Sequence, residues 1–405
     1  MGLRILIAGG GIGGLAAALA TALSGHSVKL FERASAFAEV GAGVQLGPNV
    51  TRILHGWGLA DGLRAVAAFP DFLQVRSAES GATLGRLSLG ETAVRRYGSP
   101  YVTVHRADLH GLLLDAVLKQ ANVNLNLNAE VASFSQDDDG VKVQIKSRLG
   151  DNLRSDLSSD LTGDLLVGAD GGYSPVRRQL LNDGTPIATG HLAYRAMVRQ
   201  SDLPAALRSQ PVTAWLGPKL HVVHYPVCGG DRLNVVAIIH GQIDGPLDTW
   251  DHSANTAHLQ QALTGMAAPL RDLIDAIDAW RLWPLSIRPP MRSAREHALG
   301  RVALLGDAAH PMLPYLAQGA GMAIEDAAAL ASSLGNKKRV DVAAQLQRYA
   351  QTRWQRNARV QARAIRNGQI FHATGWVAAG RDMSMKLMGE NLLDMPWLYG
   401  GGNSK

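Results

Sequence analysis

Cysteine is almost absent from this sequence: Cys228 is the only one in 405 residues, so no disulfide can form within the chain. This fits a reducing compartment, and we expect a cytoplasmic location. A lone cysteine can be a nucleophile, but nothing around Cys228 provides a context for one. We expect its side chain to be a small, buried apolar group.

Long apolar runs are also scarce. Residues 5–23 alone approach the length of a membrane span, but five of the six residues 9–14 are glycine, which disfavours a spanning helix. A signal peptide would place basic residues ahead of an uninterrupted apolar core. Leu6 stands where a myristoylation motif needs Ser or Thr. We therefore expect no stable membrane association.

Neither sign of charge is in large excess. The chain has 40 Lys and Arg against 34 Asp and Glu, a net charge of +6. Without a clustered basic patch this does not indicate nucleic-acid binding, although it favours anionic substrates and cofactors. The sequence contains no internal repeat. Its length allows two or three domains, and it leaves open whether the protein is a monomer or a homodimer.

The most informative stretch is residues 4–33. A short apolar run leads into Gly9, Gly11 and Gly14, an Ala- and Leu-rich segment follows, and a second apolar run ends at Glu32. This order predicts strand, glycine-rich turn, helix and strand. The three glycines permit a tight turn, the approach of a pyrophosphate, and close helix–strand packing. A carboxylate at the position of Glu32 accepts ribose hydroxyls, so the stretch predicts a dinucleotide site.

The segment after this unit is rich in glycine. Residues 39–49 predict a mobile loop, which is either an ordinary connection or a contact to the cofactor. A helix is expected over residues 49–67, with Asn49 as its N-cap. Residues 104–120 predict an amphipathic helix. Arg106 near its start opposes the helix dipole, so it is either a surface residue or lies close to an anion.

Two further apolar runs end in turns that carry an aspartate. Residues 164–178 predict a buried strand that breaks at Asp170, and residues 301–305 predict a strand that runs into Gly306 and Asp307. Ligands bind at the carboxyl ends of strands in doubly wound sheets. A helix starting near residue 319 would present backbone N–H groups to a negative charge.

Strands also dominate the rest of the chain. Residues 70–104 predict short strands, residues 123–145 predict strands with a hairpin, and residues 147–163 predict a polar loop. Residues 185–295 alternate like strands and lack glycine-rich phosphate turns, which predicts a second, largely antiparallel domain. Residues 343–372 predict a long helix without acidic residues, whose arginines form either a solvated face or a site for an anionic partner.

One strand of the second domain places two candidate residues together. In residues 219–226 a period of two puts His221 and Tyr225 on one face and His224 on the other. A buried His–Tyr pair is more often structural than catalytic, so the strand pattern leaves both interpretations open.

Three separated motifs occur together: Gly9–Gly14 with Glu32, Asp170-Gly171 after a buried strand, and the run that begins with Gly306-Asp307. In this combination nearly the whole chain resembles the single-component FAD-dependent aromatic hydroxylases, the class A flavoprotein monooxygenases. The resemblance implies an α/β fold with a Rossmann-like FAD-binding domain, an antiparallel β-sheet substrate domain and a C-terminal helical segment. The implied division is 1–72, 98–184 and 296–335 for FAD, 73–97 and 185–295 for substrate, and 336–405 for the helical segment.

The resemblance also implies which residues hold FAD. Arg106 lies near the diphosphate, Asp170 serves both FAD and NAD(P)H, and Asp307 takes the ribityl hydroxyls. Backbone N–H groups of residues 319–322 stabilise negative charge on the reduced flavin, and the loop 41–45 moves with the flavin. The full implied set is Gly9, Gly11, Gly13, Gly14, Glu32, Arg33, Gly43, Val44, Arg106, Asp170, Gly171, Gly306, Asp307, Pro314, Gly319, Ala320, Gly321 and Met322. No second glycine-rich dinucleotide motif is present, which fits transient binding of NADH or NADPH. We expect no metal.

Within the family the chain resembles the salicylate, 3-hydroxybenzoate and 6-hydroxynicotinate hydroxylases. The implied catalytic residues are His221 and Tyr225, and the implied substrate contacts are Gln45, His221, Tyr225 and Pro314. Gln45 stands where 6-hydroxynicotinate enzymes carry a histidine, which favours a benzenoid substrate. Ala317 stands where many relatives have glycine. The sequence assigns no partner to a substrate carboxylate; Arg195 is only a candidate.

The implied reaction uses NAD(P)H and O2 to hydroxylate a phenolic acid through a flavin C4a-hydroperoxide. His221 acts as base or proton relay, because the pKa of histidine suits neutral pH, and Tyr225 binds the phenolate. The expected substrate is salicylate, with loss of CO2, or another monohydroxybenzoate. The alternatives are a 6-hydroxynicotinate-type hydroxylase, a flavoenzyme of the same fold acting on a quinolone, antibiotic or ubiquinone precursor, and a flavin reductase without hydroxylation.

Overall fold

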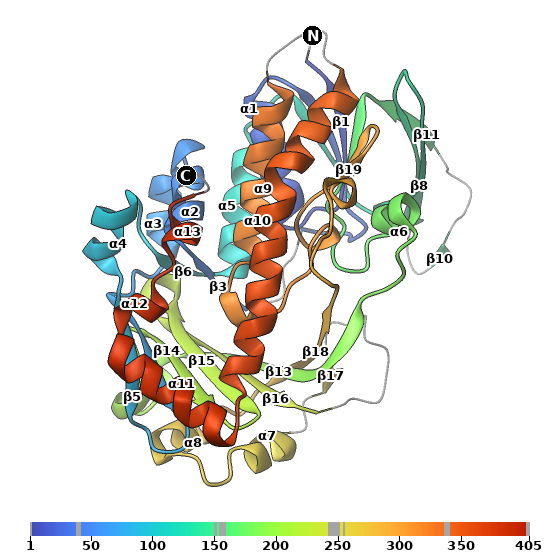
Figure 1. The fold of residues 1–405 in the computed structure, drawn as a ribbon. Helices are drawn as coiled ribbons and strands as arrows, with labels where there is room; N and C mark the ends of the chain where they lie inside the picture. Colours follow the sequence, from blue (N-terminus) through green and yellow to red (C-terminus); the bar gives the residue numbers. More distant parts are fainter. Residues whose placement is uncertain are drawn as a thin grey trace.

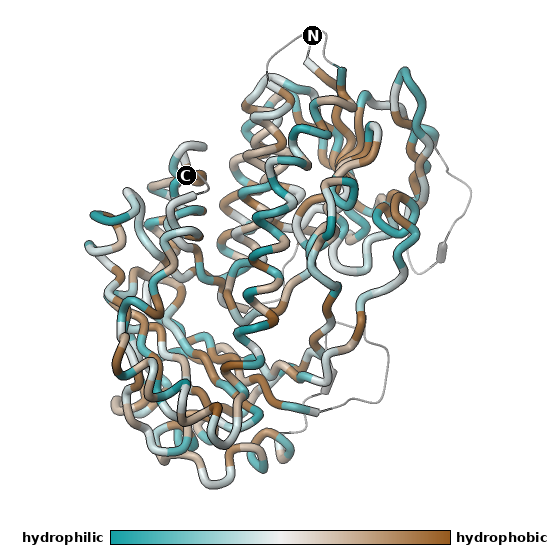
Figure 2. The backbone as a smooth tube through the Cα atoms, viewed as in Figure 1, coloured by the Kyte–Doolittle hydropathy of each residue, from teal (hydrophilic) through white to brown (hydrophobic). Residues whose placement is uncertain are grey.

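The computed structural model describes residues 2–37, 42–149, 152–153, 159–241, 252–253, 256–335 and 341–401. Two β-sheets lie at opposite ends of the molecule, and one long helix, α10, runs from one to the other (Figure 1). Hydrophobic segments concentrate in the two sheets and in the helix faces that cover them (Figure 2). None of the helices in the described part of the chain is both long and apolar enough to cross a membrane.

The first sheet has six strands in the order β19-β20-β12-β1-β2-β7. Neighbouring strands are parallel except for the β19–β20 pair. The strands are β1 (Arg4–Ala8), β2 (Ser27–Phe31), β7 (Val123–Asn126), β12 (Leu165–Gly168), β19 (Ala298–Leu299) and β20 (Val302–Leu304). With α1 (Ile12–Leu23) between β1 and β2, the unit predicted for residues 4–33 is confirmed.

Both faces of this sheet are covered, as its continuous apolar strands require. Ile5 and Ile7 pack under α1 and its neighbouring helices, while Leu6 and Ala8 pack against a small antiparallel sheet and α6. The covering elements are α5 (Arg106–Leu118), α9 (Gly319–Leu334), α6 (Pro175–Leu181), β8 (Ala129–Gln136), β9 (Val141–Leu149), β10 (Asn152–Leu153) and β11 (Ser159–Gly163).

The second sheet has eight strands in the order β17-β18-β13-β16-β15-β14-β4-β5. Only the β14–β4 pair is parallel, so the predicted antiparallel sheet is confirmed. The strands are β4 (Phe72–Ser77), β5 (Thr83–Ser88), β13 (Ile187–Arg199), β14 (Val212–Gly217), β15 (Leu220–Val227), β16 (Arg232–His240), β17 (His252–Ser253) and β18 (Arg281–Ile287). The domain boundaries given above stay a prediction.

The two faces of strand β15 have different partners. Leu220 and Val222 pack on the outer side with α7 (Thr256–Ala262) and α8 (Ala268–Asp275). Tyr225 packs on the inner side, facing the body of the molecule. The period of two predicted for this strand is therefore confirmed.

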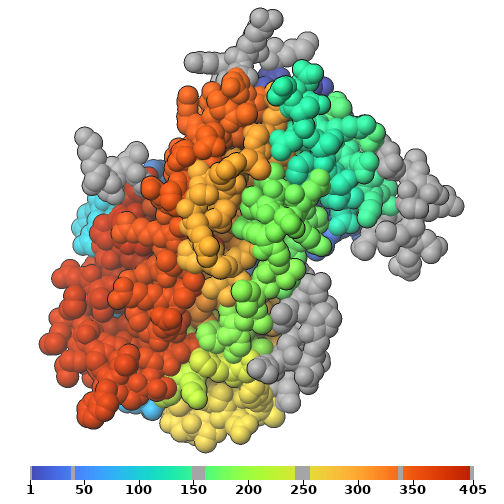
Figure 3. All heavy atoms as spheres, turned by 45° about the vertical axis from the view of Figure 1, so that its right-hand side comes forward, coloured from blue at the N-terminus to red at the C-terminus, as the bar shows by residue number. Residues whose placement is uncertain are grey.

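Helix α10 (Val342–Phe371) packs on α9 and ends beside the second sheet. The C-terminal segment covers one side of the molecule (Figure 3). It continues through α11 (Gly375–Met388), α12 (Glu390–Leu393) and α13 (Pro396–Tyr399). The predicted long helix is confirmed, but a fully solvated arginine face is wrong. Arg353 is 5% exposed and Arg356 is half-buried, because both pair with acids of α9.

In the N-terminal half the structure differs from three local predictions: the mobile loop, the start of the helix after it, and the continuity of that helix. Residues 43–46 form a strand rather than part of a mobile loop, because β3 (Gly43–Leu46) pairs with β6 (Val102–His105). The helix after it starts at Pro48 with Gly47 as N-cap, and it is broken into α2 (Pro48–Gly56) and α3 (Ala60–Val66). Residues 38–41 lie outside the described part of the chain.

Other segments also depart from expectation. A helix, α4 (Gly90–Tyr97), interrupts the strands expected over 70–104, and β11 supplies a strand within the polar segment 147–163 because it pairs with β9. Cys228 is half-buried with its thiol 3.5 Å from Asp108 Oδ2, and burial together with this carboxylate raises the pKa of the thiol to about 11. The short 3-10 helices are η1 (Gln200–Asp202), η2 (Ala205–Leu207), η3 (Cys228–Gly230), η4 (Ala294–Glu296), η5 (Gly306–Ala308) and η6 (Pro314–Leu316).

Candidate active site

A cleft lies along the carboxyl ends of the parallel strands, between the N-terminal ends of α1 and α9. It collects most of the residues predicted to hold the cofactor, from four separate strand ends. Those that line it are Gly9, Gly11, Gly13, Glu32, Arg33, Arg106, Asp170, Gly171, Gly306, Asp307, Gly319 and Ala320. A phosphate-bearing ligand here would meet the free N–H groups of two helix N-termini.

Two glycines of the first motif, Gly9 and Gly14, occupy positions that no side chain can share. Gly9 has φ +100°, and a Cβ there would lie 2.4 Å from the Ala169 carbonyl oxygen. A Cβ on Gly14 would lie 1.9 Å from the Gly9 carbonyl oxygen. Gly14 therefore does not line the cleft but allows α1 to pack closely on β1, which is the geometry that a bound pyrophosphate requires.

Glu32 is held in place at the end of β2. Its carboxylate accepts hydrogen bonds from the backbone N–H groups of Gly10, at 2.7 Å, and Ala34, at 2.8 Å. His110, which the sequence analysis missed, also lines the cleft, with its Nε2 2.8 Å from the Gly10 carbonyl oxygen. It follows Arg106 by one helical turn on α5, so helical spacing from Arg106 could have indicated it.

Asp170 follows β12 and is tied to the start of α6. Its carboxylate accepts hydrogen bonds from the Ser174 hydroxyl and, at 3.1 Å, from the Val176 N–H. Burial raises the pKa of Asp170 to about 6, against the effect of these donors. A carboxylate oriented in this way can accept a ligand hydroxyl on its cleft side.

The start of α9 differs in one respect from expectation. The Met322 N–H donates to the Gln318 carbonyl oxygen at 2.8 Å, so it is not available to a flavin; only the N–H groups of residues 319–321 remain. The Met322 side chain is fully buried. The predicted cofactor residues that do not line the cleft are Gly14, Gly43, Val44, Pro314, Gly321 and Met322.

The predicted catalytic pair lies on the inner face of the second sheet. His221 is 4% exposed and packs its ring 4.9 Å from that of Tyr315, beside the loop that contains Pro314. A Cβ on Gly43 would lie 2.6 Å from the Tyr225 ring, so β3 closes over this tyrosine. Gln45 is buried and accepts a 2.5 Å hydrogen bond from the Tyr101 hydroxyl. None of the four predicted substrate residues lines the cleft described above; His221 lies beside the Pro314 loop, and Tyr225 lies against β3.

His221 belongs to a group of four histidines. Its Nδ1 lies 2.7 Å from His372 Nε2, and His372 Nδ1 lies 2.9 Å from His240 Nε2. His191 stacks on His240 with ring centroids 4.5 Å apart. Burial lowers the pKa of His221 to about 3, with a smaller effect from His191. The expectation that its pKa suits neutral pH is therefore wrong: in this environment His221 is neutral at pH 7.

Arg195 extends from β13 into the same region. It lines the cleft together with Trp283, its guanidinium carbon lies 5.0 Å from the centre of that ring, and its Nε has no hydrogen-bond partner among the described residues. Burial lowers the pKa of Arg195, and Tyr225 raises it. The strand period that places His191 on the inner face also places Arg195 there, which is the signal that the sequence offers for it.

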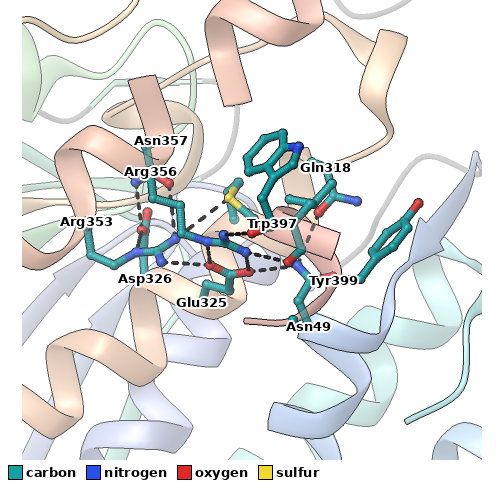
Figure 4. A network of polar contacts seen from close by, with 12 residues as sticks. Asn49, Gln318, Glu325, Asp326, Arg353, Arg356, Asn357, Trp397 and Tyr399 are labelled. Carbon is teal, nitrogen blue, oxygen red and sulfur yellow. Dashed lines mark hydrogen bonds and ion pairs between the residues drawn. The ribbon is translucent and has the colours of Figure 1, made fainter. Parts of the chain in front are cut away.

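A buried network of charges between α9 and α10 holds the turn that carries Asp307 (Figure 4). Arg353 of α10 donates to Glu325 Oε2 at 2.7 Å and to Asp326 Oδ1 at 2.8 Å. Asp326 Oδ2 in turn accepts the Gly306 N–H at 3.1 Å and lies 2.5 Å from His310 Nε2. The network therefore fixes the turn that carries Asp307 against both α9 and α10.

The arrangement fits FAD. The cleft offers glycine backbone and helix N-termini for a diphosphate, Glu32 for a ribose, and the exposed carboxylate of Asp307 for further hydroxyls. These donors and acceptors are the ones that the ADP and ribityl parts of FAD require.

Comparisons with known proteins agree with this assignment. Residues 3–364 match the family model described as FAD binding domain. The chain is 36% identical over 400 residues to a 3-hydroxybenzoate 6-hydroxylase of Polaromonas naphthalenivorans (strain CJ2), covering 98% of this chain and 96% of that protein.

Two solved structures share the fold over almost the whole chain. The structure of Klebsiella pneumoniae HpxO complexed with FAD and uric acid has a TM-score of 0.82, 26% identity and coverage of 96% of this chain and 94% of that one. A salicylate hydroxylase substrate complex has a TM-score of 0.81, 27% identity and coverage of 98% and 95%. This chain belongs to the class A family of flavin-dependent monooxygenases, and it is an FAD-dependent aromatic hydroxylase that uses NAD(P)H.

Proposed function

We propose that the chain hydroxylates a monohydroxybenzoate, with 3-hydroxybenzoate as the first candidate and the carbon para to the phenol as the position attacked. The single observation that carries this is the substrate wall: a buried His221 and Tyr225 on one sheet face, with the cationic Arg195 on the same face. The 36% identity to a 3-hydroxybenzoate 6-hydroxylase supports the choice of acid.

FAD, when bound, would take two electrons from NAD(P)H and activate O2, so that one oxygen atom enters the ring and the other leaves as water. The residues of the chain bind and orient the phenol and move its proton. Burial raises the pKa of Tyr225, so its hydroxyl stays protonated and donates a hydrogen bond to the phenolate oxygen. A phenolate is the reactive form, because its negative charge makes the ortho and para carbons nucleophilic.

His221 takes the phenol proton and must pass it on, because a protonated His221 is unfavourable at this buried position. The pKa of about 3 makes a buried imidazolium costly. The hydrogen bonds between His221 and His372 and between His372 and His240 connect His221 to solvent, because His240 is exposed. The proton can leave along this chain of imidazoles. Each imidazole can accept a proton on one nitrogen and release one from the other, so the charge need not stay inside.

Arg195 is the residue we assign to the substrate carboxylate. Its Nε lacks a partner within the described chain, and a carboxylate would satisfy it in a region where burial lowers the pKa of the guanidinium. Gln45, which accepts a hydrogen bond from Tyr101, stands where 6-hydroxynicotinate enzymes carry a histidine, and this favours a benzenoid rather than a pyridine ring. Salicylate, the substrate that the sequence analysis put first, becomes the second candidate, because the salicylate hydroxylase structure is 27% identical to this chain and the 3-hydroxybenzoate 6-hydroxylase is 36% identical.

The test is a stopped-flow measurement of flavin bleaching by NADH or NADPH, with salicylate, 3-hydroxybenzoate, 6-hydroxynicotinate or no aromatic. We expect 3-hydroxybenzoate to speed bleaching about a hundredfold, about 2.7 kcal/mol of barrier, and to yield a dihydroxybenzoate that keeps its carboxylate. Release of CO2 with salicylate as the best effector would replace the first candidate by the second. Fast bleaching without any aromatic would remove the phenolic-acid assignment.

A cytoplasmic location and a monomeric or homodimeric state stay part of the proposal. The single cysteine and the use of NAD(P)H support the location. Size-exclusion chromatography with light scattering decides between monomer and dimer.

A further inference from the structure

Three of the four histidines, those farthest from the substrate wall, are also close enough together to bind a metal ion. One ring nitrogen from each of His191, His240 and His372 lies within 4.8 Å of the other two. The three come from β13, β16 and the residue that follows α10, so the fold rather than local sequence brings them together. We propose that these three imidazoles form a reversible site for a divalent transition-metal ion of the Zn²⁺ class, and that its occupation inhibits hydroxylation. The inhibitory part rests on the proposed proton path; the binding part does not.

The donor set selects the kind of ion. Three neutral imidazoles suit Zn²⁺ and its first-row neighbours, whereas Mg²⁺ and Ca²⁺ need oxygen ligands. His372 is buried and His191 is half-buried, and burial favours the neutral imidazole, which is the form that ligates a metal ion. Three histidines leave one coordination position for water.

Two of the ligands have hydrogen-bond partners on their other ring nitrogen. His191 Nδ1 lies 2.5 Å from the Tyr315 hydroxyl oxygen, and His372 Nε2 lies 2.7 Å from His221 Nδ1. Coordination through His191 Nε2 and His372 Nδ1 keeps both contacts. Such partners fix the tautomer and orientation of a ligating histidine and are characteristic of built metal sites.

Access and charge indicate reversible binding. His240 is exposed and His191 is half-buried, so an ion can reach the site from solvent. The positive charges of Lys219 near His240 and Arg381 near His372, which lower the pKa of those imidazoles, also oppose a bound cation. Solvent access and the nearby positive charges both favour weak, reversible binding, as in a regulatory site, over the permanent binding of a structural ion.

Occupation and proton transfer exclude each other. His372 Nδ1 and His240 Nε2, now 2.9 Å apart, share the hydrogen bond that connects His221 to solvent. An ion bound by both nitrogens replaces that hydrogen bond. The proton from the phenol then has no exit by this route, and turnover falls while FAD, in a different cleft, stays bound.

The test uses the FAD-loaded protein and Co²⁺, whose ligand-field bands lie at longer wavelengths than flavin absorption. We expect a saturable band from one ion per chain, abolished by Zn²⁺. His191→Gln and His240→Gln should abolish it, Tyr315→Phe should weaken binding by about 10–100-fold, and the matched control His55→Gln on α2 should leave it unchanged. FAD content verifies that each variant is folded. Absence of the band, or equal binding by all variants, overturns the site.

A second measurement addresses the inhibition separately. Zn²⁺ should reduce NAD(P)H-dependent product formation without releasing FAD and without competing with the aromatic acid. Binding of Co²⁺ with unchanged turnover in Zn²⁺ would overturn the inhibitory role. Because metal binding is read without aromatic acid or NAD(P)H, a failure of the proposed substrate does not affect it.

Discussion

His221 and His372 are 151 residues apart in the chain and share a hydrogen bond of 2.7 Å. The bond joins the substrate wall to the end of α10. Because His372 also contacts His240, it is the middle member of the proposed proton path to solvent. In the proposed reaction it acts through His221, as a positioning and relay residue.

The relay predicts a graded loss of activity. His372→Phe keeps a ring but removes both nitrogens, and we expect product formation to fall at least about tenfold, with FAD retained. His240→Ala, at the exposed end, should lose less and should be partly restored by imidazole in the buffer. Restoration by imidazole distinguishes proton transfer from packing. Full activity of His372→Phe would exclude the path.

The proposed base can be tested directly. His221→Phe should lose most hydroxylation, roughly 10²–10⁴-fold, while the protein keeps its flavin spectrum. The measurement is product formation per FAD at saturating 3-hydroxybenzoate. Tyr225→Phe, which keeps the ring that packs against β3, is the companion variant and should raise KM more than it lowers kcat. Unchanged turnover in His221→Phe would remove it from the mechanism.

Replacing Asp307 should weaken the binding of FAD. Asp307→Ala removes a carboxylate that lines the FAD cleft, and we expect FAD affinity to fall about tenfold to a hundredfold, since hydrogen bonds to charged groups contribute about 1.5–3 kcal/mol. Titration of the apoprotein with FAD, followed by flavin fluorescence, measures this. Asp61→Ala, on an exposed part of α3, is the control and should bind FAD like the parent. Equal affinities would contradict the assignment.

Buried histidines predict how stability depends on pH. Burial lowers the pKa of His221 to about 3 and those of His224 and His297 to about 4, below the unfolded value of about 6.5. Between these values the unfolded chain binds more protons, so stability falls as pH falls, by up to about 1.4 kcal/mol per pH unit for each histidine. Urea unfolding across this range measures the slope. His224→Gln, away from the substrate wall, should reduce it; an unchanged slope would contradict the burial argument.

The charge network predicts that replacing Arg353 lowers the stability of the fold much more than replacing Arg359. Arg353→Met removes the one cation that pairs with both Glu325 and Asp326, leaving them only Arg356 and His310, and should destabilise the fold by about 3–5 kcal/mol. Arg359, exposed on the same helix with its guanidinium 4.0 Å from the Trp397 ring, is the control. Arg359→Met should cost about 1 kcal/mol or less. Similar unfolding midpoints for both variants would refute the role of the network.

Much of the FAD cleft could be predicted because its residues follow strand ends in recognisable order. Glu32, Asp170 and Asp307 each stand directly after an apolar run, and the fold of parallel strands brings such positions to one edge. The shared face of His221 and Tyr225 follows from the two-residue period of a strand. In each case a local pattern carries the information.

The residues that could not be predicted depend on distant contacts. Nothing near His372 indicates that it meets His221, and the row of arginines in α10 does not reveal that Arg353 is buried against acids of α9. The glycine-rich segment 43–46 is a strand only because β6 pairs with it. Here tertiary packing overrides local preference.

The position of α10 also sets an order of events during synthesis. Asp326 and Glu325 leave the ribosome 27 and 28 residues ahead of Arg353, which neutralises them in the native protein. Until α10 has emerged, a nascent chain carries every glycine of the cofactor motif, but Glu325 and Asp326 lack the arginines of α10 that pair with them in the native protein. Docking of the same helix brings His372 to His221. Completion of the fold and assembly of the proposed proton path therefore occur together, and a chain that stops before His372 lacks that path.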